Sequence, residues 1–482
     1  MSPARGLVAI VGFLACVEFA SGILQGYYTP IFSDMAHHLR IADADVNWFE
    51  ASQLVVSALL VPPLARLGDL IGHRRVLLLA TAVTAAGSWV MAFAPNFATF
   101  LVGTAMQGAY VVWLPLEVAI IHRRTSGSDR RDQLTRRSAA VLVAVLEFSV
   151  IVGALASGAL VESLSMTTVL AIPAVVVTLC LAAIWFGVEE VAGTAEGRFD
   201  WAGLAVLTTM VGLVMGGLIA MRLQGPGAVL PWLLIVAGVA MVVPFCRVEA
   251  ARHAPLVDVR LMATPAQWPL QVTAFLFGIS ILGAQIPLST YLRSDPNTAG
   301  YGFGLTASET SLRIGLYVLS LMIGALSYPA LARRIGVRWA LVAATLLVAI
   351  GYAGWLPFHD SRVLTVVTMV IAGAGSGALV AALPAAAAAV SPHDRVGFAT
   401  GMTNATKTLG GAVASAVFAI CLAATGSLGD PDFGHAPLSG YLAVWSICAV
   451  SALIGAIALM ATTTMGAPAE AGTPIEAGQI RR

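Results

Sequence analysis

The chain has 482 residues, of which 58% are hydrophobic and 11% are charged, and its formal net charge is +1. A soluble globular domain carries about 25% charged residues, so this composition excludes a soluble enzyme with a hydrated surface. The small net charge and the lack of a large basic block also exclude nucleic acid as a partner.

Long apolar runs, separated by charged or Pro/Gly/Asn-containing breaks, predict fourteen membrane spans. A helix needs ~20 apolar residues to cross a bilayer. The first run is too long for the apolar region of a signal peptide and is expected to be retained. The predicted fold class is therefore an all-α integral membrane protein. In chain order the predicted spans are 6–29, 46–66, 76–95, 98–121, 139–162, 167–187, 201–221, 228–246, 266–292, 306–332, 338–358, 363–390, 398–425 and 440–464.

The arginines predict the orientation of these spans, because cytoplasmic loops carry an excess of basic residues. With the N-terminus in the cytoplasm, 20 arginines fall inside and five outside. Six of the inner ones lie between 123 and 137, where contact with lipid headgroups is expected. The prediction is a multi-pass protein of the cell inner (plasma) membrane with both termini cytoplasmic. The five outer arginines are Arg40, Arg222, Arg293, Arg313 and Arg362.

Two internal echoes indicate a repeat. Residues 70–78 (LIGHRRVLL) resemble 334–342 (RIGVRWALV), and 152–160 (VGALASGAL) resemble 410–418 (GGAVASAVF). Each echo lies eight spans after its partner, which fits two six-helix halves with two helices inserted between them, an architecture typical of transporters. The predicted domains are an N-terminal six-helix bundle (1–188), a linker with two extra helices and an amphipathic segment (189–265), a C-terminal six-helix bundle (266–465) and a cytoplasmic tail expected to be disordered (466–482).

Four stretches along the chain carry a resemblance, namely LARLGDLIGHRR (64–75), MQGAYVVWLP (106–115), APLVDVRLM (254–262) and VGFATGMTNATKTLGGAVASAV (396–417). They resemble the major facilitator superfamily, specifically its fourteen-helix drug:proton antiporter family. The resemblance implies a secondary active exporter of amphipathic drugs, antibiotics or lipid-like compounds that works by proton antiport and alternating access.

The chain departs from this family's pattern at several places, three of which bear on the mode of coupling. Thr104 stands where the fourth helix usually has Arg, and residues 153–158 (GALASG) lack the proline of the fifth-helix signature. Ser21 stands where the first helix usually has an acid, although Glu18 lies one turn earlier. These departures leave open an alternative, a transporter of the same fold that works by symport or facilitated diffusion.

The resemblance also implies a gating loop on the cytoplasmic side, formed by Asp69, Gly72, Arg74 and Arg75. The local chemistry of Asp69 equally suits capping of the third span, since a helix N-terminus favours an anion. The two arginines equally suit the role of plain positive-inside anchors.

Three acids lie clearly within spans, namely Glu18, Glu117 and Glu147. An ionisable residue deep in a membrane costs ~2.5–3.5 kcal/mol to insert and is usually functional. Each could carry the coupling proton, bind a cationic substrate or pair with a buried cation. Glu117 and Glu147 could also share a proton with one another, or extend toward the basic loop at 122–137.

The predicted substrate cavity combines these acids with polar residues of other spans. Of the 26 basic residues only Lys407 is a lysine, and it lies ~18 Å into its span, where it is expected to face Glu18 or, alternatively, Glu147. The acids fit a cationic substrate and the lysine an anionic one, so the substrate's charge stays open. The candidate cavity residues are Glu18, Gln25, Gln107, Asn404 and Lys407.

No sequence signature of an enzyme is present. The chain has no phosphate-cradling loop, no catalytic Ser/His/Asp cluster and no cysteine pair with zinc-ligand spacing. The prediction is a monomer without cofactor or metal, whose partners are a small-molecule substrate, protons and membrane lipids.

Overall fold

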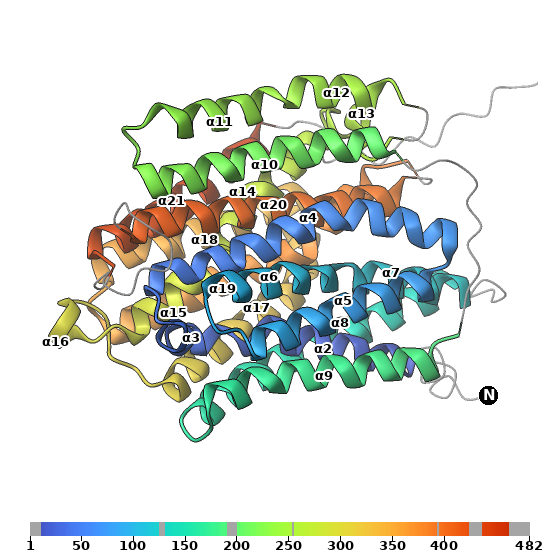
Figure 1. Ribbon diagram of the computed structural model, residues 1–482. Helices are drawn as coiled ribbons and strands as arrows, with labels where there is room; N and C mark the ends of the chain where they lie inside the picture. The colour runs from blue at the N-terminus through green and yellow to red at the C-terminus, as the bar shows by residue number, and fades with distance from the viewer. Residues whose placement is uncertain are drawn as a thin grey trace, which may run out of the picture.

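The computed structural model describes residues 11–124, 131–189, 200–252, 255–392, 395–423 and 436–461, and all the regular secondary structure in these ranges is helical (Figure 1). Part of the predicted basic loop at 123–137 and the predicted tail at 466–482 lie outside the described residues.

Thirteen helices in the described ranges are long and apolar enough to cross a membrane. Each coincides with one of the predicted spans, from the second at 46–66 to the last at 440–464. The first predicted span contains α2 (Leu14–Tyr27), and residues 1–10 before it are outside the described ranges. The multi-pass helical fold is therefore confirmed, whereas the number fourteen stays a prediction.

The first part of the chain forms a helical body with its own apolar core. That core draws almost all its buried side chains from residues 11–188, among them Trp113 and Phe100, which are fully buried. The elements are α2, η1 (Thr29–Ile31), α3 (Phe32–Leu39), η2 (Asp43–Asp45), α4 (Val46–Ile71), α5 (His73–Ala92), α6 (Phe97–Gln107), η3 (Gly108–Val112), α7 (Trp113–Arg124), α8 (Arg131–Val161) and α9 (Met166–Gly187).

The last part of the chain forms a second body around a separate core, which includes Trp445 and Tyr291. Its longest helix, α17, begins with a capping box in which Thr306 and Glu309 satisfy each other's backbone N–H groups. The elements are α14 (Trp268–Ile281), α15 (Gln285–Arg293), α16 (Pro296–Ala299), α17 (Ala307–Ile335), α18 (Val337–Phe358), α19 (Arg362–Ala389), α20 (Val396–Leu422) and α21 (Leu438–Met460).

Between these bodies the chain forms a helical hairpin, which is the layer at the top of Figure 1. It packs through a third apolar cluster on both α4 and α20, one helix from each body. At one end of the hairpin Arg222 donates to Asp45 over 3.3 Å, and both side chains are buried. The hairpin elements are α10 (Trp201–Gln224), α11 (Val229–Ala240), α12 (Val242–Ala250) and, after it, the short α13 (Val259–Met262).

Two glycines allow equivalent close contacts in the two bodies. A Cβ at Gly26 in α2 would lie 2.1 Å from the carbonyl oxygen of Val150 in α8. A Cβ at Gly278 in α14 would lie 1.9 Å from the carbonyl oxygen of Lys407 in α20. Small residues permit such backbone approach between membrane helices. These contacts place α8, which carries Glu147, directly against α2. They place α20, which carries Lys407, directly against α14.

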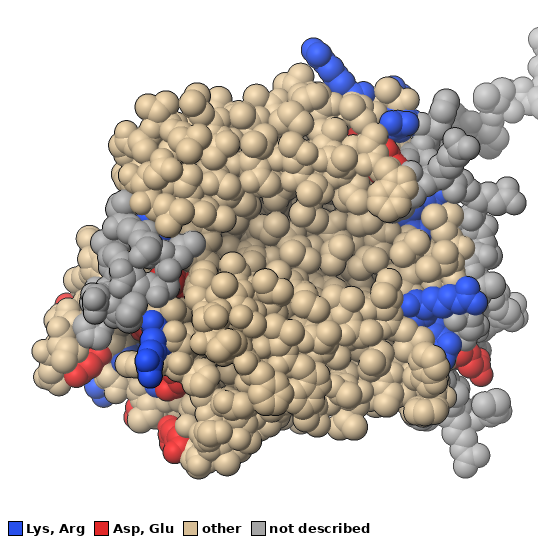
Figure 2. Space-filling view, in the orientation of Figure 1, with Lys and Arg blue, Asp and Glu red and all other residues tan. Residues whose placement is uncertain are grey.

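Charged side chains gather at the two ends of the bundle, and Figure 2 shows a broad uncharged face between them. We call the end where α2 ends and α4 begins the outer end, following the orientation predicted from the arginines. The end where α4 passes into α5 at Gly72 is the inner end. This pattern is the one expected of a protein whose middle faces hydrocarbon.

Candidate functional site

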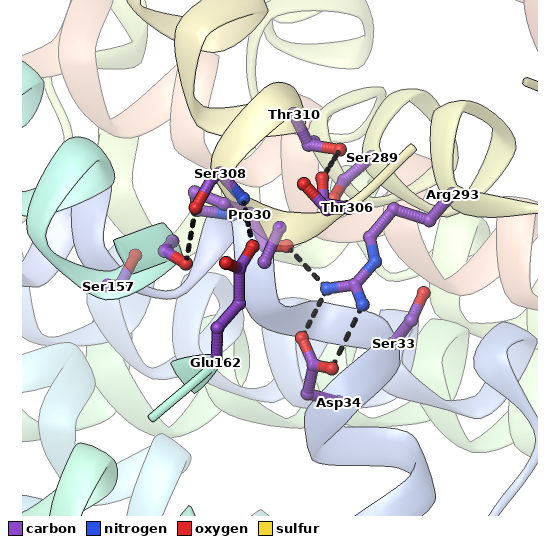
Figure 3. Close-up of polar contacts among 12 residues, drawn as sticks. Pro30, Ser33, Asp34, Ser157, Glu162, Ser289, Arg293, Thr306, Ser308 and Thr310 are labelled. Atoms are coloured by element: carbon purple, nitrogen blue, oxygen red, sulfur yellow. Dashed lines mark hydrogen bonds and ion pairs between the residues drawn. The ribbon is translucent and has the colours of Figure 1, made fainter. Parts of the chain in front are cut away.

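At the outer end the two helical bodies are joined by an ion pair. Arg293, at the end of α15, donates through both terminal nitrogens to the carboxylate of Asp34 in α3, and also to the carbonyl oxygen of Pro30 over 3.0 Å (Figure 3). Such two-pronged contacts between guanidinium and carboxylate fix geometry as well as adding energy. The pair therefore holds the outer tip of α15 against α3.

A second contact joins the bodies nearby, between the end of α8 and the start of α17. The backbone N–H of Ser308 donates to Glu162 over 3.2 Å, and its hydroxyl donates to the carbonyl oxygen of Gly158 over 3.1 Å (Figure 3). Hydrogen bonds from Ser308 lower the pKa of Glu162, so this carboxylate is ionised at neutral pH. Ser289 also donates to the carbonyl oxygen of Thr29. We call these contacts together the outer closure.

A cavity with about 80 Å³ of space for water-sized molecules lies next to the outer closure. Both bodies contribute to its wall, since Gln25 comes from α2 and Gln285 from α15. The described lining residues are Leu24, Gln25, Tyr28, Thr29, Phe32, Met35, Phe49, Glu50, Gln53, Leu54, Met91, Thr104, Gln107, Tyr110, Leu282 and Gln285.

The polar side chains of this wall are mostly bonded to one another. Gln107 donates to Tyr28 and to Ser88, both over 3.0 Å, and accepts a hydrogen bond from Gln53 over 3.2 Å. Gln25 donates to Ser21. The structure thus places two of the predicted cavity residues, Gln25 and Gln107, at this cavity.

Glu50 is a lining residue that the sequence analysis did not identify. It lies in the second turn of α4, facing a cavity that has no other charged side chain in its described wall. The signal was present in the sequence, because residue 50 falls inside the predicted span 46–66. Its position near a span end is also that of an ordinary interfacial acid, and the sequence alone does not distinguish the two.

Glu18 and Glu117 form a carboxyl pair in the interior of the first body. They come from α2 and α7, which pack together, and both side chains are fully buried. The two carboxyl groups interact directly with each other. Within the described ranges no N–H or O–H group donates to any of their four oxygens. The sequence left open a proton shared between Glu117 and Glu147, whereas in the structure the carboxyl group that Glu117 interacts with is that of Glu18.

Lys407 interacts with Glu147 across the interior, between α20 of the second body and α8 of the first. The sequence favoured Glu18 as the partner of Lys407 and kept Glu147 as the alternative, and the structure has the alternative. Glu18, Asn404 and Lys407 are not among the residues that line the cavity next to the outer closure. Asn404 lies on α20, three residues before Lys407.

The predicted gating residues lie around the break between α4 and α5 at the inner end. Gly72 has φ of 106°, a conformation that favours glycine, and ends α4. Asp69 lies within the last turn of α4 and not in the loop that follows it. The break between the two helices begins only at Gly72. Arg74 donates to the carbonyl oxygen of Trp185 at the end of α9, and Arg75 is exposed on α5. The residue that caps the N-terminus of α5 is Gly72, and no side-chain hydrogen bond caps this end of the helix.

The chain is similar to known transporters over most of its length. It is 25% identical to the uridine/deoxyuridine transporter of Lactococcus lactis over 84% of this chain and 85% of the relative. It is 28% identical to the cephamycin export protein CmcT of Amycolatopsis lactamdurans over 82% and 80%, respectively. It is 22% identical to the multidrug resistance protein Stp of Mycobacterium tuberculosis over 81% and 71%.

Solved transporter structures share the fold. A peptide transporter of the POT family superposes with a TM-score of 0.67 at 13% identity, covering 95% of this chain and 97% of that one. The nucleoside transporter NupG superposes with a TM-score of 0.62 at 15% identity, covering 94% and 99%. The family model described as "Major Facilitator Superfamily" matches residues 14–297 and again 270–481. With a membrane-spanning helical fold and a family match over most of its length, the chain belongs to the Major Facilitator Superfamily and is a transporter rather than an enzyme.

Proposed function

We propose that the protein exports amphipathic small molecules, such as drugs, antibiotics or lipid-like compounds, in exchange for protons across the cell inner membrane. The observation that carries this proposal is the Glu18–Glu117 pair. This pair is a buried site that can take up a proton, and it lies in a fold whose two bodies are joined by non-covalent contacts at the outer end.

A proton accounts for the pair in physical terms. Two ionised carboxylates in contact, with no donor in the described ranges, repel each other in a medium of low dielectric constant. One shared proton turns this repulsion into a hydrogen bond. A site that is stable only when protonated releases its proton when a change of shape brings water to it, which is the property that antiport requires.

Alternating access requires that the outer closure form and break in each cycle. The two bodies are the rigid parts that would rock against each other, and the inserted hairpin contacts both of them. The residues around Gly72 are proposed to serve the corresponding role at the inner end. Both termini are proposed to be cytoplasmic, and the working unit is proposed to be the monomer.

Export is supported by the similarity to the cephamycin export protein and to the multidrug resistance protein. A second candidate is transport of a nucleoside with a different coupling, supported by the similarity to the uridine/deoxyuridine transporter. The glutamine-rich wall of the cavity suits the hydrogen-bonding groups of such a ligand.

Flux into proteoliposomes under an imposed pH gradient separates these functions. Ethidium, a permanent cation that pH trapping does not affect, is expected to accumulate on the acidic side, because antiport moves it against the proton flow. Uridine is the second probe. Accumulation on the alkaline side would indicate symport, and equal concentrations on both sides would indicate facilitated diffusion, so either result contradicts proton-coupled export.

The outer closure leads to a separate prediction. Asp34→Asn removes the charge that holds Arg293, which is expected to favour opening of the outer end. A loss of ~1 kcal/mol of interaction would shift the equilibrium between the closed and open outer end about fivefold. A cysteine introduced at Gln25 in the cavity wall should then react several times faster with a membrane-impermeant maleimide added outside. Exchanging the charges, with Asp34→Arg and Arg293→Asp together, should restore slow labelling. Unchanged labelling in the single variant would contradict the role of the pair.

A further inference from the structure

The cavity next to the outer closure has an uneven distribution of charge. Glu50 is the one charged side chain among its described lining residues, and no lysine or arginine faces it there. We infer that Glu50 binds the positively charged end of the substrate, and that the cavity selects organic monocations that carry a flat apolar group. This inference rests on the proposed transport function and names the chemical class of its substrate.

The first argument is the lack of a donor for Glu50. Its neighbours Gln53 and Gln107 are bonded to each other, and Gln107 is also bonded to Tyr28 and Ser88. In the described ranges Glu50 has neither a hydrogen bond nor a paired cation. Glu50 is half-buried, and a carboxylate partly shielded from water without a partner is costly, so a ligand that brings a cation to it gains the interaction the protein does not supply.

The second argument is the aromatic surface around this carboxylate. Tyr28, Phe32, Phe49 and Tyr110 all contribute to the same wall. Phe49 is held in place by Phe97 and Phe100, whose ring centres lie 5.0 and 4.6 Å from its own. Aromatic faces attract cations and stack on flat rings, most strongly where water is excluded. The wall therefore offers both parts of the proposed ligand a partner.

The third argument is size. The cavity holds about 80 Å³ of space for water-sized molecules while the outer end is closed. A single water needs ~10–15 Å³ of such space, so the cavity accommodates a group of several heavy atoms. An ammonium head with a small ring fits this description, and a larger substrate would extend between the two bodies when the closure breaks.

The test is equilibrium binding of radiolabelled phenyltrimethylammonium to the purified full-length protein in detergent. We expect the wild type to bind it, and Glu50→Gln to weaken binding at least tenfold. Glu50→Asp, which keeps the charge, should weaken binding less. Glu189→Gln removes an exposed glutamate that is remote from the cavity and is the matched control, expected to bind like the wild type. Size-exclusion chromatography checks that each variant is folded.

Competition then tests the charge preference. Benzoate and benzyl alcohol, an anion and a neutral molecule with the same ring, should displace the probe at least tenfold less effectively than unlabelled phenyltrimethylammonium. Absence of wild-type binding, equal binding in Glu50→Gln or equal displacement by benzyl alcohol would each overturn the inference. The proposed function is judged separately, because proton-driven accumulation of a neutral amphipathic drug such as chloramphenicol by the wild type would stand even if the cation site failed.

Discussion

Glu18→Gln and Glu117→Gln are each expected to abolish proton-driven accumulation of substrate, lowering its initial rate at least tenfold. Glutamine keeps the shape of the side chain but cannot take up or release a proton. Exchange of labelled for unlabelled substrate across the membrane needs no net proton movement and should survive. The measurement is accumulation under a pH gradient compared with exchange at equal pH, in the same proteoliposomes.

The pair makes a sharper prediction than either residue alone. If the two carboxyl groups hold one proton between them, the double variant should be no worse than the single ones, whereas independent sites would show additive losses. Glu189→Gln, which changes an exposed glutamate, serves as the control for expression and insertion. If either single variant retains proton-driven accumulation, the pair is not the coupling site and Glu147 becomes the candidate.

The membrane-spanning helices could be predicted from sequence because their signal is local. Each span is a run of ~20 apolar residues, and burial of backbone polar groups in hydrocarbon forces such a run to be helical. The thirteen membrane-length helices in the described part of the chain therefore coincide with predicted spans. The short elements η1 and α3 were not predicted, since each is only a few residues long and lies between two spans.

The contacts of the site could not be predicted because depth in the membrane does not determine neighbours. By the rise per residue alone, Glu18 lies near the middle of the membrane and Glu117 ~9–14 Å from its edge, which gives no reason to pair them. The packing of α2 on α7 brings them together. Likewise Asp34 and Arg293 are 259 residues apart, and only the meeting of the two bodies makes them partners.

Lys407 provides the second large effect that we expect. It is the only lysine of the chain, and its electrostatic partner is Glu147 on α8. Lys407→Ala should impair transport more than Lys407→Arg, because arginine keeps a cation opposite Glu147. Loss of the cation leaves Glu147 without the charge that it interacts with, so the alanine variant should also unfold at a lower temperature. Transport rate and the melting temperature in detergent measure the two effects.

A double-mutant cycle separates this pair from the other acids. If Lys407 and Glu147 act together, Lys407→Ala combined with Glu147→Gln should do less harm than the sum of the single changes, by ~0.5–3 kcal/mol. Lys407→Ala with Glu18→Gln is the matched control and should be additive, because Glu18 interacts with Glu117 instead. A pair that only holds α8 and α20 together would lower the melting temperature while the surviving protein transports normally. A stable and fully active Lys407→Ala protein would contradict both roles, since the cation would then serve neither the cycle nor the packing.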